Sequence, residues 1–286
     1  MDIPRLAFSS DLVLSALLGI AALHYSALRP EDGQLSYAAG YYFDRAVRNH
    51  RLALKNVDEK SAEGVLATAI LITHHTWVSA HSLRFEPYEL PLQVYYMARG
   101  IDTLFQQMWP WSRGSGYLWY VDRIPISDQE EISHDDPFLH SSQQDLTRLS
   151  DALNRMAIST RDMAIYEEAM REIYLMCQAI SNKDSPVVLQ RRVATMPVRL
   201  SGKFLDMLKA KDPAALAILA RNLCLLNAIE SVWWLHGSGP SQKVAENSIL
   251  GIAKMIPDQW SWAMEWPSLV LAGALGPRLY PVNHES

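Results

Sequence analysis

The chain has 286 residues, 49% of them apolar, which is enough to bury a substantial core in one large domain or two small ones. Its formal net charge of −5 argues against the basic character of a free-standing nucleic-acid-binding protein. The two cysteines, Cys177 and Cys224, lie far apart and form no CxxC or Cys/His cluster. This excludes a disulfide framework and a cysteine-based zinc site, and the apolar helical runs around both residues predict buried thiols in a reducing compartment.

The most apolar N-terminal segment is DLVLSALLGIAALHYSAL, residues 11–28. Its length suits the core of a signal peptide and is marginal for a membrane span. However, Asp2 and Asp11 offset Arg5, and no small-residue cleavage site follows. We therefore expect no membrane span, and we predict a fully buried central helix capped at SSD, residues 9–11.

Helical periodicity continues through the next segments and predicts helices over 34–56, 61–82 and 88–107. A proline-rich and acidic stretch without a sustained period then predicts a long irregular loop over about 109–144. Long loops inside compact domains are commonly functional lids.

Further helices are predicted over 145–181, 186–195 and 198–210. Asp212, followed by Pro213, is the strongest helix start in the chain, and that helix is expected to run through SVWWLH to Gly237. One more helix follows in SQKVAENSILGIAKMI, and DQWSWAMEWP ends the pattern at Pro267. No strand is needed. The sequence predicts an all-α fold, a single domain of about ten helices over 1–286.

The run over 213–267 resembles the C-terminal regulatory domain of fungal zinc-cluster transcription factors, specifically the sterol-uptake-control group. The shared order is an Ala/Leu-rich helix, a WW pair, a glycine turn, an amphipathic helix and a W-x-W-x-x-x-W-P terminus. The segments DLVLSALLGIAALHYSAL, YYFDRAVRNHRLALKNV and YYMARGIDTLFQQMW resemble the family's N-terminal half. The resemblance spans about residues 11–270.

One departure concerns DNA binding. Family members carry a six-cysteine binuclear zinc cluster, and this sequence has only two cysteines. Either the sequence is an isolated regulatory domain or the natural protein lacks the DNA-reading module, and the initial Met1 favours the second reading. In both cases we expect no direct nucleic-acid binding by this chain. The resemblance implies a nuclear location, but no basic cluster supports it, so the expectation is nucleus or cytoplasm.

The resemblance also implies a deep apolar pocket for a sterol-like or other lipophilic small molecule. Such a ligand calls for aromatic and aliphatic walls with one or two placed polar groups. Trp233 and Trp234 would face about 100° apart on a helix, so one would pack in the core and the other would reach a cavity or interface. The predicted ligand-binding residues are Trp233, Trp234, His236, Ser238, Tyr96, Met97, Phe105 and Trp262. Ordinary core packing is the competing interpretation.

Two other functions remain open. Asp135 and Asp136 belong to the main acidic cluster and are the candidate catalytic residues of an enzyme that would use Mg²⁺ on an isoprenoid or polyketide substrate. The chain could instead be a helical interaction scaffold, and a homodimer or a co-regulator protein is the expected protein partner. If the chain is not such an enzyme, we expect no cofactor or metal. His74 and His81 are the candidate metal ligands, and they lie about 10 Å apart along their helix, too far to bind one metal ion without another ligand between them.

Overall fold

The computed structural model describes residues 3–82, 88–112, 136–229 and 244–275. These residues form twelve α-helices, two 3-10 helices and no strand, so the predicted all-α fold is confirmed. The chain divides into two compact units, which we describe separately. By their described residues, unit 1 contains helices α1 to α5 and unit 2 contains α7 to α14. A single domain over 1–286 stays a prediction.

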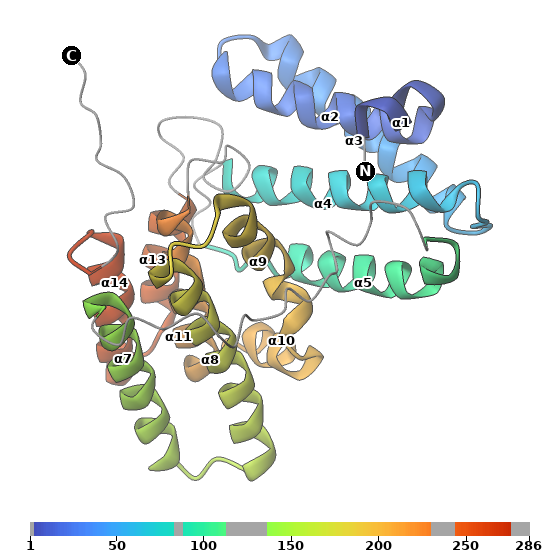
Figure 1. Ribbon diagram of the computed structural model, residues 1–286. Helices are drawn as coiled ribbons and strands as arrows, with labels where there is room; N and C mark the ends of the chain where they lie inside the picture. The colour runs from blue at the N-terminus through green and yellow to red at the C-terminus, as the bar shows by residue number, and fades with distance from the viewer. Residues whose placement is uncertain (1–2, 83–87, 113–135, 230–243, 276–286) are drawn as a thin grey trace. The chain divides into compact units, whose positions relative to one another are not determined.

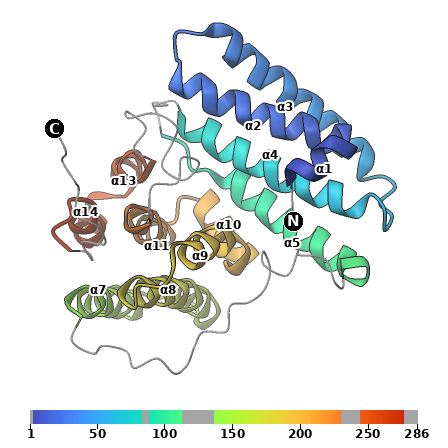
Figure 2. The same ribbon diagram turned by 45° about the horizontal axis from the view of Figure 1, so that its top comes forward.

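Unit 1 is a group of five helices in which α2 and α3 run antiparallel side by side (Figures 1 and 2). Its elements are α1 Ile3–Ser9, α2 Asp11–Leu28, α3 Gly33–Ala53, α4 Ala62–Ser82 and α5 Leu92–Ser112. Local chemistry sets the helix starts. The Ser10 hydroxyl accepts a hydrogen bond from the Val13 amide at 3.5 Å, and the Asp32 carboxylate accepts one from the Gln34 amide at 3.0 Å.

A small residue allows α2 and α3 to approach each other closely. A Cβ atom added to Gly19 would lie 3.2 Å from the backbone nitrogen of Phe43.

Two apolar clusters form the core of unit 1 in the described residues. The first consists of Ala62, Val65, Leu66, Ala69, Ile70, Ile101, Phe105 and Met108. The second consists of Ala7, Val13, Ala16, Ala46, Ala67, Leu71 and Ile72.

The burial of α2 differs from expectation. Only 22% of this 18-residue helix is buried, so the prediction of a fully buried central helix is wrong. The reason is that α2 packs against α1, α3 and α4 but keeps an outer face that exposes Tyr25 and Leu28. By length and composition alone, α2 is the one helix in the described ranges that could cross a membrane. The core helices of soluble proteins and signal sequences pass the same test.

Unit 2 is built around α11, in which every residue from Ala214 to Cys224 is buried. This helix packs against α8, α13 and α14, and α7 forms an antiparallel hairpin with α8 (Figures 1 and 2). The helices are α7 Pro137–Asn154, α8 Thr160–Ser181, α9 Pro186–Arg199, α10 Gly202–Lys209, α11 Pro213–Cys224, α13 Val244–Met255 and α14 Glu265–Leu271, with 3-10 helices η1 Leu225–Ala228 and η2 Asp258–Met264.

The predicted loop over 109–144 is shorter than expected in the described residues. Helix α5 continues to Ser112, and α7 already begins at Pro137. The single helix predicted over 145–181 is also wrong, because the chain leaves α7 after Asn154 and restarts at Thr160. Ser159 caps the new helix by accepting a hydrogen bond from the Asp162 amide at 3.1 Å.

The helix that starts at Pro213 is also shorter than predicted. Asp212 is its N-cap, as expected, and accepts a hydrogen bond from the Ala215 amide at 2.9 Å. The α-helix ends at Cys224, a 3-10 turn follows, and Ile229 is extended with φ −98° and ψ 138°. A continuous helix to residue 236 is therefore excluded.

Candidate functional site

A buried ion pair in unit 2 holds η2, the 3-10 helix that carries two of the C-terminal tryptophans. Arg221, on α11, is fully buried. Its Nε and Nη2 donate to the two carboxylate oxygens of Asp145 at 2.6 and 2.8 Å, and its Nη1 donates to the carbonyls of Ala217 and Ala263 at 2.8 and 3.0 Å. The guanidinium thus connects α7, α11 and η2. With so many of its donors already used, it stabilises the fold and is not open to a ligand.

The tryptophans of the W-x-W-x-x-x-W-P pattern lie on η2 and α14. Trp260 and Trp262 stack with ring centroids 5.9 Å apart. Trp266 is 5% exposed, stacks on Phe138 at 6.2 Å, and donates from Nε1 to the Ser141 hydroxyl at 3.0 Å. Trp266 therefore fills the contact between α14 and α7, and Trp260 is buried beside Trp262, so both have a packing role.

Trp262 is the least buried of the three, and an arginine covers its ring. The Arg148 guanidinium carbon lies 4.9 Å from the ring centroid, and Arg148 also pairs with Glu265 at 2.6 Å. Both charged side chains are more than half exposed. Trp262 accordingly lies under a surface ion pair, where it contacts both the core and the solvent-facing charges.

Three of the predicted ligand-binding residues lie on α5 in unit 1. Phe105 belongs to the first core cluster, and Met97 packs against the second. Tyr96 is 45% exposed. These side chains leave α5 in different directions, and two of them contribute to ordinary core packing. Within the described ranges, two pockets of unit 2 are lined by residues other than Tyr96, Met97, Phe105 and Trp262.

The rest of the predicted ligand set lies outside the described residues. This applies to Trp233, Trp234, His236 and Ser238. Their participation in a pocket stays a prediction.

The candidate catalytic pair is described only in part, because Asp135 lies outside the described residues. Asp136 is the N-cap of α7. Its carboxylate accepts hydrogen bonds from the Phe138 amide at 3.0 Å and from the Ser181 hydroxyl. Both oxygens are thus engaged in starting α7 and joining it to α8.

The two thiols are buried, as the sequence predicted. Burial raises the pKa of Cys177 to about 12 and also raises the pKa of Cys224 well above its ordinary value. A neutral thiol is a poor nucleophile, so neither residue is suited to catalysis. Among the described residues, no group of three or more His, Cys, Asp or Glu side chains could hold a metal ion.

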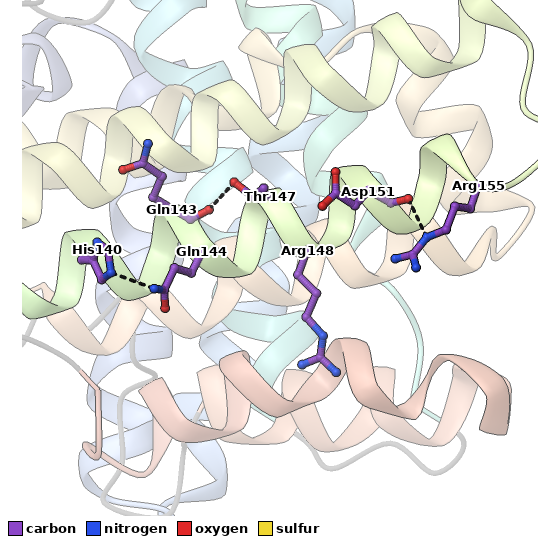
Figure 3. A pocket seen from close by; sticks show the side chains of 7 residues that line it. All are labelled: His140, Gln143, Gln144, Thr147, Arg148, Asp151 and Arg155. Carbon is purple, nitrogen blue, oxygen red and sulfur yellow. Dashed lines mark hydrogen bonds between the residues drawn. The ribbon is translucent and has the colours of Figure 1, made fainter.

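An open polar groove runs along α7, with a cavity volume of about 510 Å³ (Figure 3). Its lining residues are His140, Gln143, Gln144, Thr147, Arg148, Asp151 and Arg155. Several of these side chains bond within the helix itself. For example, Thr147 donates to the Gln143 carbonyl at 2.8 Å. The groove lacks the apolar walls that a lipophilic ligand requires.

The described residues form an all-α region with a tryptophan cluster, and the chain is similar in sequence to fungal transcription factors. The chain is 26% identical over 225 residues to the Zn(2)-C6 fungal-type transcription factor afumD of Aspergillus fumigatus, covering 76% of this chain and 57% of that protein. It is 25% identical over 287 residues to a Zn(2)-C6 fungal-type transcription factor of Gibberella zeae, covering 93% of this chain and 54% of that protein. It is 23% identical over 250 residues to Sterol uptake control protein 2 of Candida albicans, covering 82% and 34%.

The predicted resemblance to fungal zinc-cluster transcription factors is therefore confirmed over most of the chain. The chain spans about half the length of the first two relatives and a third of the length of the last. No family model matches the chain, and no solved structure matches it.

Proposed function

We propose that this chain is a ligand-sensing regulatory region related to fungal transcription factors, and that it binds a sterol-like or other lipophilic small molecule. The observation that carries the proposal is the similarity to two Zn(2)-C6 transcription factors and to a protein named for the control of sterol uptake. The proposed role of the chain is transcription regulation, and its expected location is the nucleus.

The composition of the chain supports the ligand part of this proposal. Nine tryptophans and eleven methionines make the chain rich in the aromatic and flexible apolar side chains from which a pocket for a rigid hydrophobic ligand can be built. Burial of apolar ligand area contributes about 25 cal/mol per Å², so tight binding would not require a charge. The residues proposed to line the pocket are Trp233, Trp234, His236 and Ser238.

The enzyme alternative gains no support from the described residues, because Asp136 is engaged as a helix cap. It makes a separate prediction that is simple to test. Asp135→Asn would abolish a Mg²⁺-dependent activity, whereas a ligand sensor would show no turnover.

The proposal is tested by native mass spectrometry before and after organic extraction, followed by thermal unfolding with a panel of sterols. A ligand at 100 times its Kd stabilises a protein by about 2.7 kcal/mol, which raises the Tm by roughly 5–10 °C in a chain of this size. We expect a stoichiometric lipid in the purified chain, or a Tm increase of this size with at least one sterol.

Two tryptophan variants locate the ligand. One of the two variants, Trp233→Ala or Trp234→Ala, should reduce the sterol-induced Tm increase by at least half, because one of the two rings is proposed to contact the ligand. Trp111→Ala removes an exposed ring from α5 and serves as the matched control. If the chain carries no lipid and no sterol raises its Tm, the proposal fails.

A further inference from the structure

An irregular segment of unit 2, residues 88–91, places a tyrosine on α13. The Tyr88 ring lies against the backbone of Gly251, which is buried. A Cβ atom added to Gly251 would lie 2.6 Å from Cδ2 of this ring and closer still to Cγ, so the contact requires a residue without a side chain. Gly251 therefore provides a flat surface on which a ring can lie.

The Tyr88 ring enters this position with its hydroxyl group first. The residue as a whole is partly exposed, but its hydroxyl oxygen is buried. A tyrosine at a protein surface usually does the reverse and keeps its hydroxyl in water. Burial raises the pKa of Tyr88, and the Ser248 hydroxyl lowers it by a smaller effect, so the two hydroxyl groups lie near each other.

Ser248 is a buried polar group that is not used. It is 0% exposed and lies three residues before Gly251, on the same face of α13. A hydroxyl inside a helix can donate to the carbonyl four residues earlier, as Thr68 on α4 does to Gly64 at 2.7 Å. Ser248 has no hydrogen-bond partner within the described part of the chain, and neither has the Tyr88 hydroxyl. Leaving both groups unpaired costs stability.

Tyr88 therefore fits this position imperfectly. Its ring matches the flat surface at Gly251, but the backbone of residues 88–91 holds the ring where its hydroxyl does not bond to Ser248. A free molecule is not held by a backbone, so its ring can move until the donor and acceptor reach hydrogen-bond geometry. Such a molecule would gain a contact that Tyr88 lacks.

We propose that this face of α13 binds a flat ring that carries one hydroxyl group, and that such a ligand displaces Tyr88. Gly251 provides the wall for the ring, and Ser248 provides the hydrogen-bond partner. The space that Tyr88 leaves is that of one phenol ring, so the ligand is a monocyclic phenol or the hydroxylated end of a sterol. The sterol form rests on the proposed function and names a contact for the sterol hydroxyl, whereas the phenol form does not depend on it.

The first test uses the full chain and p-cresol, which is the tyrosine side chain as a free molecule. Binding is measured by calorimetry. Tyr88→Ala should bind p-cresol at least tenfold more tightly than the unchanged chain, because the ring no longer competes. Tyr37→Ala removes a tyrosine that is 76% exposed and should have no effect.

Two double variants distinguish a hydroxyl-binding site from a simple cavity. Ser248→Ala, added to Tyr88→Ala, should weaken p-cresol binding several-fold and should not weaken the binding of toluene, which has no hydroxyl. Gly251→Ala, added to Tyr88→Ala, should abolish the binding of both, and the chain should fold because alanine favours a helix. Gly40→Ala is the matched control, since a Cβ atom there meets nothing within 4 Å.

The second test asks whether ergosterol or cholesterol, each with a single hydroxyl, displaces p-cresol from Tyr88→Ala. We expect displacement by at least one of them, and tighter binding of that sterol to Tyr88→Ala than to the unchanged chain. Binding of p-cresol that is insensitive to Ser248→Ala and Gly251→Ala overturns the site. A sterol that raises the Tm without displacing p-cresol overturns the sterol form alone and leaves the proposed function intact.

Discussion

At the scale of single residues, the ion pair between Arg221 and Asp145 joins α11 to α7 with side chains that are only 0% and 9% exposed. Removal of one partner leaves the other charged and buried, which costs about 3–5 kcal/mol. We therefore expect Arg221→Ala or Asp145→Ala to lower the free energy of unfolding by that amount, measured by urea denaturation.

The matched control is the exposed pair of Arg148 and Glu265, whose distance of 2.6 Å equals the shortest contact of the buried pair. Because water screens this pair, Arg148→Ala should cost less than about 1 kcal/mol. If the buried and the exposed pair lost equal free energy of unfolding, burial would not determine how much each pair contributes to stability.

Another residue-scale prediction concerns His75 in the core of unit 1. The ring is 7% exposed and stacks on Phe43 with centroids 4.0 Å apart, and burial lowers its pKa to about 4. In the unfolded chain the pKa of His75 is about 6.5. As the pH falls from 6.5 towards 4, the unfolded state therefore binds a proton that the folded state does not bind. Stability is therefore lost by up to about 1.4 kcal/mol per pH unit.

Unfolding by urea at pH 6.5 and pH 4.5 measures this loss. His75→Gln should make the free energy of unfolding less dependent on pH over this interval. His140→Gln, an exposed substitution on α7, should not. His50 and His74 have pKa values lowered in the same direction, so part of the dependence should remain. An unchanged pH dependence in His75→Gln contradicts the assignment.

At the scale of helices, two N-caps offer a direct comparison because both precede proline. Asp212 accepts a hydrogen bond from the Ala215 amide and another from the Tyr166 hydroxyl, each at 2.9 Å. Ser185 holds the same position before Pro186 but forms no side-chain cap bond. Asp212→Ala should therefore lower the free energy of unfolding by about 1–2 kcal/mol, and Ser185→Ala should change it little.

Thermal unfolding of both variants decides this point. The Asp212 cap also begins the helix at the centre of unit 2, so its loss should reduce the Tm of the whole unit and not only fray one turn. A larger loss for Ser185→Ala would show that the caps are not responsible.

The helix starts at Ser10 and Asp212 could be predicted from the sequence, while the partial burial of α2 and the helix breaks could not. Ser10 and Asp212 cap their helices as expected, because capping depends on a few neighbouring residues. The burial of α2 depends on which helices cover it, and one sequence does not contain that information. The break after Cys224 was missed because the apolar pattern continues through LLNAI without interruption.

At the scale of the whole molecule, the all-α class followed from helical periodicity, and the similarity to fungal transcription factors followed from the order of motifs along the chain. The buried Arg221 was missed, although an arginine in the apolar run AILARNLCLL was a signal. Its partner is 76 residues away in sequence, a distance over which periodicity gives no guidance.

The placement of the thiols has a practical consequence. Both cysteines of the chain lie in unit 2, one on α8 and one on α11, and both are 0% exposed. A thiol-reactive dye will therefore label the protein only when this half opens, and opening of the N-terminal helices will leave no signal. The rate of thiol labelling therefore measures the opening of unit 2 selectively, without an engineered reporter.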